Sequence, residues 1–183
     1  AGAADVVGDI KKLPLQMPSY LDNLARGDII VEGDGALLLE VIERRDDGVL
    51  CHPTQAGVLH PGRGIVLRKS DFRPAALTEK DRADLVAAVR SGVFDALALS
   101  FISSGHDVES ARALAVANGP TLPLVAKIET ALGVDNIEEI AQRADMLMAA
   151  RGDLAFSMPW EELPMGVAAI QRAAVSSGCP WIL

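Results

Sequence analysis

A chain of 183 residues with 50% hydrophobic content is long enough to form one or two domains with a buried core. Its net charge of −8 argues against nucleic acid or an anionic membrane as a partner, because both attract clusters of Lys and Arg. No apolar run reaches the ~18 residues of a membrane span. Cys51 and Cys179 form no disulfide or metal-binding pattern, which fits a reducing compartment, so we expect a cytoplasmic protein.

The first part of the chain has the pattern of a small antiparallel β domain. Residues 1–19 contain two prolines and little periodicity, which predicts an extended lead-in. Residues 20–70 contain short apolar runs separated by Gly33-Asp34-Gly35 and Asp46-Asp47-Gly48. Asp-Gly between such runs favours hairpins, because glycine accepts the positive φ of tight turns. We therefore predict a small antiparallel β domain at 20–70.

Residues 71–183 change to an alternation of helices and strands. Thr78 and Asp81 have the spacing of a capping box, which predicts a helix start. The expected helices span 78–91, 107–118, 135–143 and 164–177, and the expected strands span 96–101, 123–129, 146–150 and 181–183. This order predicts parallel βαβ units, an α/β fold that forms a portion of a TIM (β/α)8 barrel. The open strand edges of a half-barrel lead us to expect a homo-oligomer.

The strongest functional signal lies at the ends of two neighbouring predicted strands. Lys127 and Glu129 alternate along one strand and so share one face, and Asp153 follows the next strand. The carboxyl ends of barrel strands are where active sites form. Two carboxylates suit Mg²⁺ or Mn²⁺, and a nearby lysine can stabilise charge on a phosphoryl group or an enolate. The alternative is an ordinary ion pair at the end of the sheet.

The segment Arg151-Gly152-Asp153 offers a second kind of contact. Gly152 lets the main chain approach a ligand closely. A short helix after it would present free N–H groups to a carboxylate. The site would then hold a small anionic acid bound to the metal.

Longer motifs around these residues resemble the pyruvate kinase family. Lys127-Ile128-Glu129 is followed by Gly133-Val134 and by Ala150-Arg151-Gly152-Asp153-Leu154, and Ser100-Phe101-Ile102 precedes them in the family's order. The run Gly27-Asp28-Ile29-Ile30-Val31 resembles the end of the family's small lid domain. The resemblance implies glycolytic phosphoryl transfer from phosphoenolpyruvate to ADP, giving pyruvate and ATP, with Mg²⁺ (or Mn²⁺) and usually K⁺.

The resemblance also implies roles for individual residues. Lys127 would stabilise the phosphoryl group in transfer and the enolate left behind. Glu129 and Asp153 would bind the metal, and the backbone of Gly152 and Asp153 would receive the substrate carboxylate, with Arg151 among the substrate-binding residues.

Three further residues are assigned to the substrates through the same resemblance. Ser100 would line the site and Phe101 would pack beneath it. Arg63 would reach the nucleotide phosphates, unless its glycine-rich segment is a plain solvated turn. The segments that carry the K⁺ ligands in the family have no counterpart in this sequence.

Two alternatives remain at this stage. A metal-dependent aldolase or lyase of the HpaI-like type also binds a pyruvate enolate through a Glu and an Asp, but it typically lacks equivalents of Lys127 and Arg151. A catalytically incomplete relative, acting as a binding or structural fragment, is suggested by departures from the family pattern. Ser103 stands where a basic residue is usual, Ala155 replaces a glycine, and Ser157 or Met158 replaces a glutamate.

Overall fold

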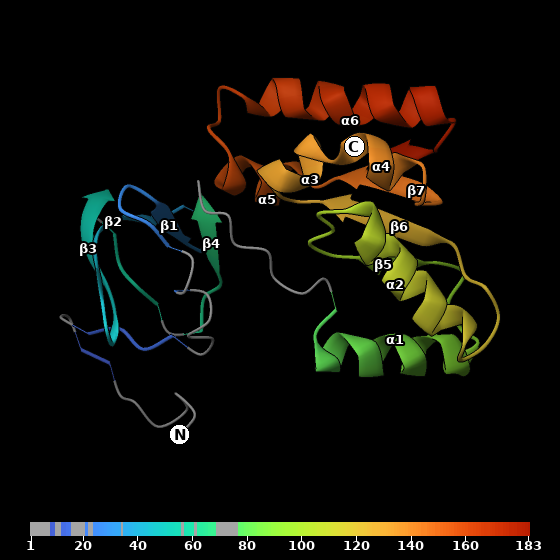
Figure 1. Ribbon diagram of the computed structural model, residues 1–183, viewed down its shortest axis with the longest axis horizontal. Coiled ribbons are helices and arrows are strands. Elements are labelled where there is room, and N and C mark those ends of the chain that lie inside the picture. The colour runs from blue at the N-terminus through green and yellow to red at the C-terminus, as the bar shows by residue number, and fades with distance from the viewer. Residues whose placement is uncertain are drawn as a thin grey trace. The chain divides into compact units, whose positions relative to one another are not determined.

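The computed structural model describes most of the chain (Figure 1). The described residues are 8–9, 12–15, 21, 24–33, 35–55, 57–60, 62–68 and 77–183. Contacts divide the chain into two compact units, Ala1–Pro74 and Ala75–Leu183. Most of the predicted lead-in at 1–19, together with Asp34 and Pro61 of the predicted turns, lies outside the described residues.

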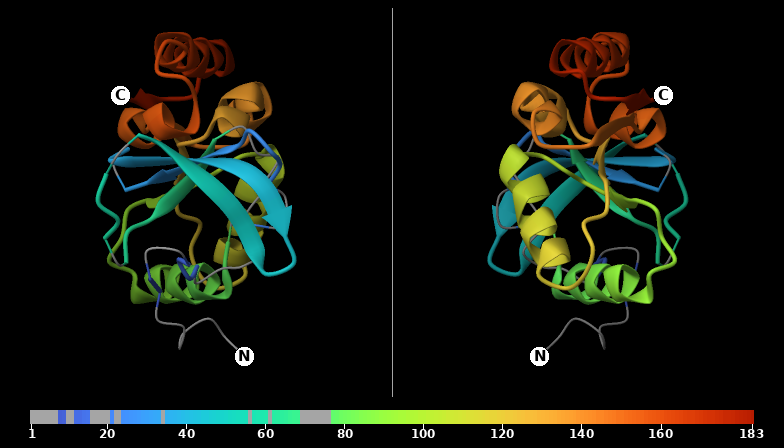
Figure 2. Two further views of the ribbon diagram at one scale, coloured as in Figure 1. Left: turned by 90° about the vertical axis from the view of Figure 1, so that its left-hand side faces the viewer. Right: turned by 90° about the vertical axis from the view of Figure 1, so that its right-hand side faces the viewer.

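The first unit contains the predicted antiparallel sheet, with strand order β3-β2-β1-β4. Its strands are β1 (Ile29–Glu32), β2 (Leu37–Arg45), β3 (Gly48–Gln55) and β4 (Ile65–Arg68). Strands β2 and β3 form a long twisted hairpin (Figure 2), in which Arg45 pairs with Gly48. The two aspartates 46 and 47 therefore form the turn, and the glycine begins the next strand.

A small apolar core holds this unit together. Leu24, Ile30 and Val41 are each at most 7% exposed, and Leu39 and Leu67 pack against them. Burying an aliphatic side chain of this size contributes about 1.5–3 kcal/mol, so the alternating apolar residues of these strands account for the stability of the sheet.

The second unit contains a four-stranded parallel sheet, with strand order β5-β6-β7-β8. Its strands are β5 (Leu97–Leu99), β6 (Leu124–Ile128), β7 (Met146–Ala149) and β8 (Trp181–Ile182). Its helices are α1 (Glu79–Ser91), α2 (Gly105–Val116), α3 (Ala131–Asp135), α4 (Ile137–Ala141), α5 (Arg151–Ser157) and α6 (Leu163–Ser177). The predicted βαβ alternation is confirmed, and each strand lies within two residues of its expected bounds at either end. No helix of the described residues is both long and apolar enough to cross a bilayer.

Helix starts follow the capping chemistry of the sequence. Thr78 and Asp81 form the predicted capping box of α1, with each side chain accepting from the other residue's backbone N–H. The helix predicted to begin at Asp107 begins at Gly105 instead, because Ser104 and Asp107 form a second capping box. Each box satisfies N–H groups that would otherwise lack a partner at a helix start.

The helix predicted over 135–143 is present in shorter form as α4, whereas the short helix α3 that precedes it was not predicted. The structure has two short helices, α3 and α4, with the boundary at Asn136. The Asn136 amide donates to the backbone oxygen of Ser103 at 2.8 Å. Thr130 caps α3 by accepting from the N–H of Gly133 at 3.1 Å. These contacts give the segment after β6 its own short helix.

The two faces of the parallel sheet differ. On one face Leu124, Ile128 and Leu147 are fully buried in the main core, against α2, α4 and α6. In Figure 1 these helices lie along the sheet, and α1 lies beside α2. On the other face the alternate positions include Lys127 and Met148, which are partly exposed and are neighbours in register. The helix-covered face supplies the stability, and the other face carries the polar residues.

Candidate functional site

The end of β6 presents a lysine and a glutamate on the face away from the helices. Lys127 Nζ lies 2.5 Å from Glu129 Oε1, and Glu129 is only 3% exposed. Ile128, between them, points into the main core and is fully buried. The alternation expected for a strand therefore brings the two predicted residues into direct contact.

The turn after β5 holds both of these side chains. Ser100 Oγ accepts from Lys127 Nζ at 3.1 Å, and the backbone N–H of Phe101 donates to Glu129 Oε2 at 2.6 Å. The predicted strand 96–101 ends at Leu99, so residues 100 and 101 belong to this turn. Phe101 is 48% exposed, and the group that it contributes to these contacts is its backbone amide.

The end of β7 leads directly into α5, which carries the Arg-Gly-Asp segment. Arg151, Gly152 and Asp153 form the first turn of this helix and are exposed. A Cβ built at Gly152 would meet no heavy atom within 4 Å, so the described part of the chain gives no packing reason for a glycine here. Ala150 at the N-cap gives no side-chain cap. The first turn of α5 is thus open for a ligand.

A cavity of about 690 Å³ lies at this end of β7 and β8. Its lining residues are Met148, Ala149, Ala150, Arg151, Gly152, Leu163, Ile182 and Leu183. The cavity is wide open to solvent, apolar along the strands and polar at Arg151. Arg151 and Gly152 therefore lie on an open, shallow surface, and their assignment to the substrate stays a prediction.

Asp153 is not joined to the other predicted metal ligand. Among the described residues its side chain makes no hydrogen bond or ion pair, whereas both oxygens of Glu129 are engaged. No group of three or more His, Cys, Asp or Glu side chains within the described ranges could hold a metal ion. Two carboxylates are still a suitable donor set for Mg²⁺, which usually keeps several waters and binds substrate oxygens as well. The binding of such an ion by Glu129 and Asp153 stays a prediction.

Arg63 and Ser103, two residues noted in the sequence, make contacts outside the Lys127–Glu129 pair. Arg63 lies in the first unit, where its Cδ is 3.7 Å from the place of a Cβ at Gly33, so it packs along the β1–β2 turn. Its assignment to nucleotide phosphates stays a prediction. Ser103, at the position where the family is usually basic, donates through its N–H and Oγ to Asp107. This serine therefore belongs to the cap of α2.

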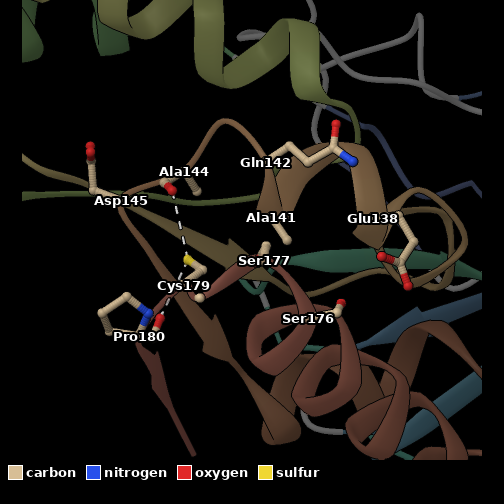
Figure 3. Close-up of a pocket in the computed structure, with 10 residues that line it drawn as sticks. Glu138, Ala141, Gln142, Ala144, Asp145, Ser176, Ser177, Cys179 and Pro180 are labelled. Carbon is tan, nitrogen blue, oxygen red and sulfur yellow. Dashed lines mark hydrogen bonds between the residues drawn. The ribbon is translucent and has the colours of Figure 1, made fainter.

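A second cavity, of about 590 Å³, lies at the opposite ends of β7 and β8 (Figure 3). It contains none of the predicted site residues. Asp145, on its wall, accepts from Leu124 N–H at 2.8 Å and from Arg112 at 2.9 Å. Burial acts to raise the pKa of Asp145, but these two donors hold it below the usual range. Burial, together with the negative charge of Asp145, raises the pKa of the Cys179 thiol.

The sequence did not reveal the backbone amide that holds Glu129. Phe101 has a positive φ of 56°, the only such value for a non-glycine among the described residues. Left-handed backbone is usually signalled by glycine or asparagine, so a phenylalanine gives no warning of it. Only the contact itself identifies this part of the site.

The parallel βα units, with polar residues at the carboxyl ends of the strands, place the chain in the class of (β/α)8-barrel proteins. The family model described as "Pyruvate kinase, barrel domain" matches residues 3–179, and the chain belongs to this family. It is 35% identical over 165 residues to pyruvate kinase of Geobacillus stearothermophilus, covering 88% of this chain and 28% of that protein. It is also 35% identical over 161 residues to pyruvate kinase of Thermococcus litoralis, covering 88% and 34%.

A solved structure gives the same result for the fold. The crystal structure of a pyruvate kinase from Cryptosporidium parvum matches with a TM-score of 0.83 and 25% identity, covering 90% of this chain and 35% of that one. The chain thus spans about a third of the length of the relatives it matches. The architecture is a portion of a TIM barrel preceded by a small antiparallel β unit, as the sequence predicted.

Proposed function

We propose that this chain carries part of a site for phosphoryl transfer from phosphoenolpyruvate to ADP, which yields pyruvate and ATP. The observation that carries the proposal is the pair of contacts that Lys127 makes. Its ammonium is held by Ser100 and by the buried Glu129, at the end of the sheet where barrel active sites lie. The family membership of the chain supports the same reaction.

Lys127 is the catalytic residue of this proposal. Phosphoryl transfer develops charge on the phosphoryl oxygens and leaves an enolate, and a fixed cation lowers the energy of both. Because Ser100 and Glu129 hold the ammonium in place, little reorganisation is needed when the substrate arrives. The lysine therefore contributes electrostatic stabilisation and does not form a covalent bond.

Glu129 and Asp153 are the proposed ligands of Mg²⁺ or Mn²⁺. Such an ion would neutralise part of the negative charge of the substrate. The backbone of Gly152 and Asp153 would receive the substrate carboxylate, with Arg151 beside it on the cavity wall. The open space at Gly152 supports this assignment.

The proposal also includes the nucleotides, a second cofactor, the assembly state and the location. We propose ADP and ATP as the nucleotides, with Arg63 as a candidate contact to their phosphates. We also propose K⁺ as a second cofactor, homo-oligomeric assembly and a cytoplasmic location. These rest on the family relationship and on the sequence.

Phosphorus NMR tests the reaction directly. Phosphoenolpyruvate and ADP would be incubated with Mg²⁺, K⁺ and the wild-type chain. The ATP formed would be compared with that formed by the Lys127→Met variant. Lys80→Met is the matched control, because Lys80 is an exposed helix lysine paired with Asp84. We expect ATP from the wild type and from Lys80→Met, with at least a hundredfold less from Lys127→Met, the scale of one electrostatic donor.

Each other result has a definite meaning. ATP formed equally by Lys127→Met would contradict the role of the lysine. No ATP from the wild type would overturn phosphoryl transfer by this chain on its own. Metal-dependent binding of phosphoenolpyruvate without turnover would then support the catalytically incomplete alternative, and release of pyruvate from a hydroxy-acid aldol would support the lyase.

A further inference from the structure

The backbone of Phe101 adopts a conformation that bulky residues rarely take. Its φ of 56° lies in the left-handed region, where the Cβ of an L-residue is crowded by the following carbonyl. Burial of the ring does not explain this geometry, since the residue is 48% exposed. Residues held in such conformations occur where surrounding contacts compensate for the strain, often at functional sites.

The compensating contact is a short hydrogen bond to Glu129. The N–H of Phe101 donates to Oε2 at 2.6 Å, while Oε1 faces Lys127 at 2.5 Å. The carboxylate is 3% exposed, so water cannot replace either partner easily. Glu129 is thus held at both oxygens, one by the backbone of the β5–α2 turn and the other by its own strand neighbour.

We propose that Phe101 is a positioning residue whose backbone N–H holds Oε2 of Glu129, so that Oε1, which faces Lys127 in this structure, is the oxygen that would bind a divalent cation. The inference deepens the proposed function and rests on its assignment of Glu129 as a metal ligand. A donor on the second oxygen of a ligating carboxylate sets the orientation of the carboxylate, and loss of such a partner typically weakens metal binding about 10–100-fold. The phenyl ring has no part in this role.

The role of the amide predicts an unusual mutational pattern. Phe101→Gly keeps the N–H and adopts a positive φ readily, so it should bind metal like the wild type. Replacing Phe101 with phenyllactate changes the amide to an ester and removes only the N–H. The matched control is an ester at Ser103, whose N–H donates to Asp107 at 3.0 Å in the same loop, away from Glu129.

The measurement is the dissociation constant of Mn²⁺, obtained from the electron paramagnetic resonance signal of the free ion. We expect a 10–100-fold weaker constant for the ester at 101, and constants within about twofold of the wild type for Phe101→Gly and for the ester at 103. An ester at 101 that binds Mn²⁺ like the wild type would overturn the proposal. So would a loss in Phe101→Gly as large as the loss in the ester.

Two further measurements separate this inference from the proposed function. If Glu129→Gln binds Mn²⁺ as tightly as the wild type, the metal assignment itself fails. If Glu129→Gln loses Mn²⁺ and the ester at 101 does not, only the positioning role fails. In the unmodified chain, the Phe101 amide proton should be shifted downfield and should remain so when Mg²⁺ is added. A return to the value of an unbonded amide would show that the carboxylate leaves it, against the proposal.

Discussion

Lys127 and Glu129 form an ion pair in which the two partners are unequally buried. Nζ lies 2.5 Å from Oε1, the glutamate side chain is 3% exposed and the lysine side chain is 25% exposed. Removing one partner of a buried pair costs more than the pair itself contributes, because the other charge is left without compensation in a poorly solvated place. The buried charge of Glu129 is therefore compensated mainly by Lys127, and the loss of the lysine should destabilise the fold.

We expect Lys127→Met to destabilise the fold by about 1–3 kcal/mol, below the range for a fully buried pair because the lysine is partly solvated. Adding Glu129→Gln to this variant should recover part of the loss, since the unpaired charge is then removed. Urea unfolding of the two single variants and the double variant gives the coupling energy. Additive effects of the two substitutions would contradict a direct interaction.

Alanine substitutions at Gly133 and Gly152 test packing and ligand binding separately. A Cβ at Gly133 would lie 2.7 Å from the backbone oxygen of Ile102, whereas a Cβ at Gly152 would meet nothing within 4 Å. Alanine is favoured over glycine in helices by up to about 1 kcal/mol, but a backbone clash at Gly133 exceeds this gain. We expect Gly133→Ala to lose about 1–3 kcal/mol and Gly152→Ala to lose none, by thermal unfolding.

The same comparison tests the substrate site. If the backbone at 152 receives a carboxylate, Gly152→Ala should weaken phosphoenolpyruvate binding although the fold is unaffected. Equal loss of stability in both variants would contradict the packing difference. Unchanged binding in Gly152→Ala would contradict the assignment of this backbone to the substrate.

Replacing Asp153 should leave the stability of the fold unchanged and weaken metal binding, whereas Glu129 is buried and paired. Asp153 is exposed and its side chain has no partner among the described residues, so Asp153→Asn should change stability by no more than about 0.5 kcal/mol. As a proposed metal ligand it should nevertheless be required for tight Mn²⁺ binding. Calorimetric titration with Mn²⁺ checks this, with Asp95→Asn as an exposed control on the same unit. A stability loss comparable to that of Lys127→Met would show that the carboxylate has a structural role.

The part of the fold that the sequence predicted is the part governed by local periodicity and capping. The alternation of strands with helices and the capping box at Thr78 were present in the residues themselves. The short helix α3 before Asn136 was not predicted, because the contacts at its ends include a hydrogen bond from Asn136 to Ser103, 33 residues away. The apolar spacing over 135–143 indicated only the helix that follows.

The candidate site was predictable to a similar extent. Strand alternation was sufficient to place Lys127 beside Glu129, because their contact follows from the strand geometry. The contacts from Ser100 and Phe101 depend on how the turn after β5 lies against β6, and no local pattern encodes that arrangement. Contacts between residues this far apart in the sequence can be identified only from the three-dimensional structure.

Acid should destabilise the second unit through Asp145. Its pKa is lowered in the folded state, so its contribution is fully present above the pKa of a free aspartate, about 3.9, and is lost as the pH falls through the lower folded value. We expect Asp145→Asn to lose about 1 kcal/mol near neutral pH, a modest value because the side chain is 43% exposed. The difference from the wild type should shrink as the pH falls below the pKa of a free aspartate. In urea unfolding, a difference that does not decrease with falling pH would contradict the linkage.

The two cysteines provide a second test of Asp145 with an internal control. Burial raises the pKa of both thiols, but only Cys179 is also affected by the charge of Asp145. Because the thiolate is the reactive form, both cysteines should be alkylated by iodoacetamide at pH 8 more slowly than a free thiol. Asp145→Asn should speed the reaction at Cys179, because the negative charge that raises the pKa of this thiol is removed, and should leave Cys51 unchanged. Peptide mass spectrometry resolves the two sites, and equal acceleration at both would indicate general loosening of the fold instead of an electrostatic effect.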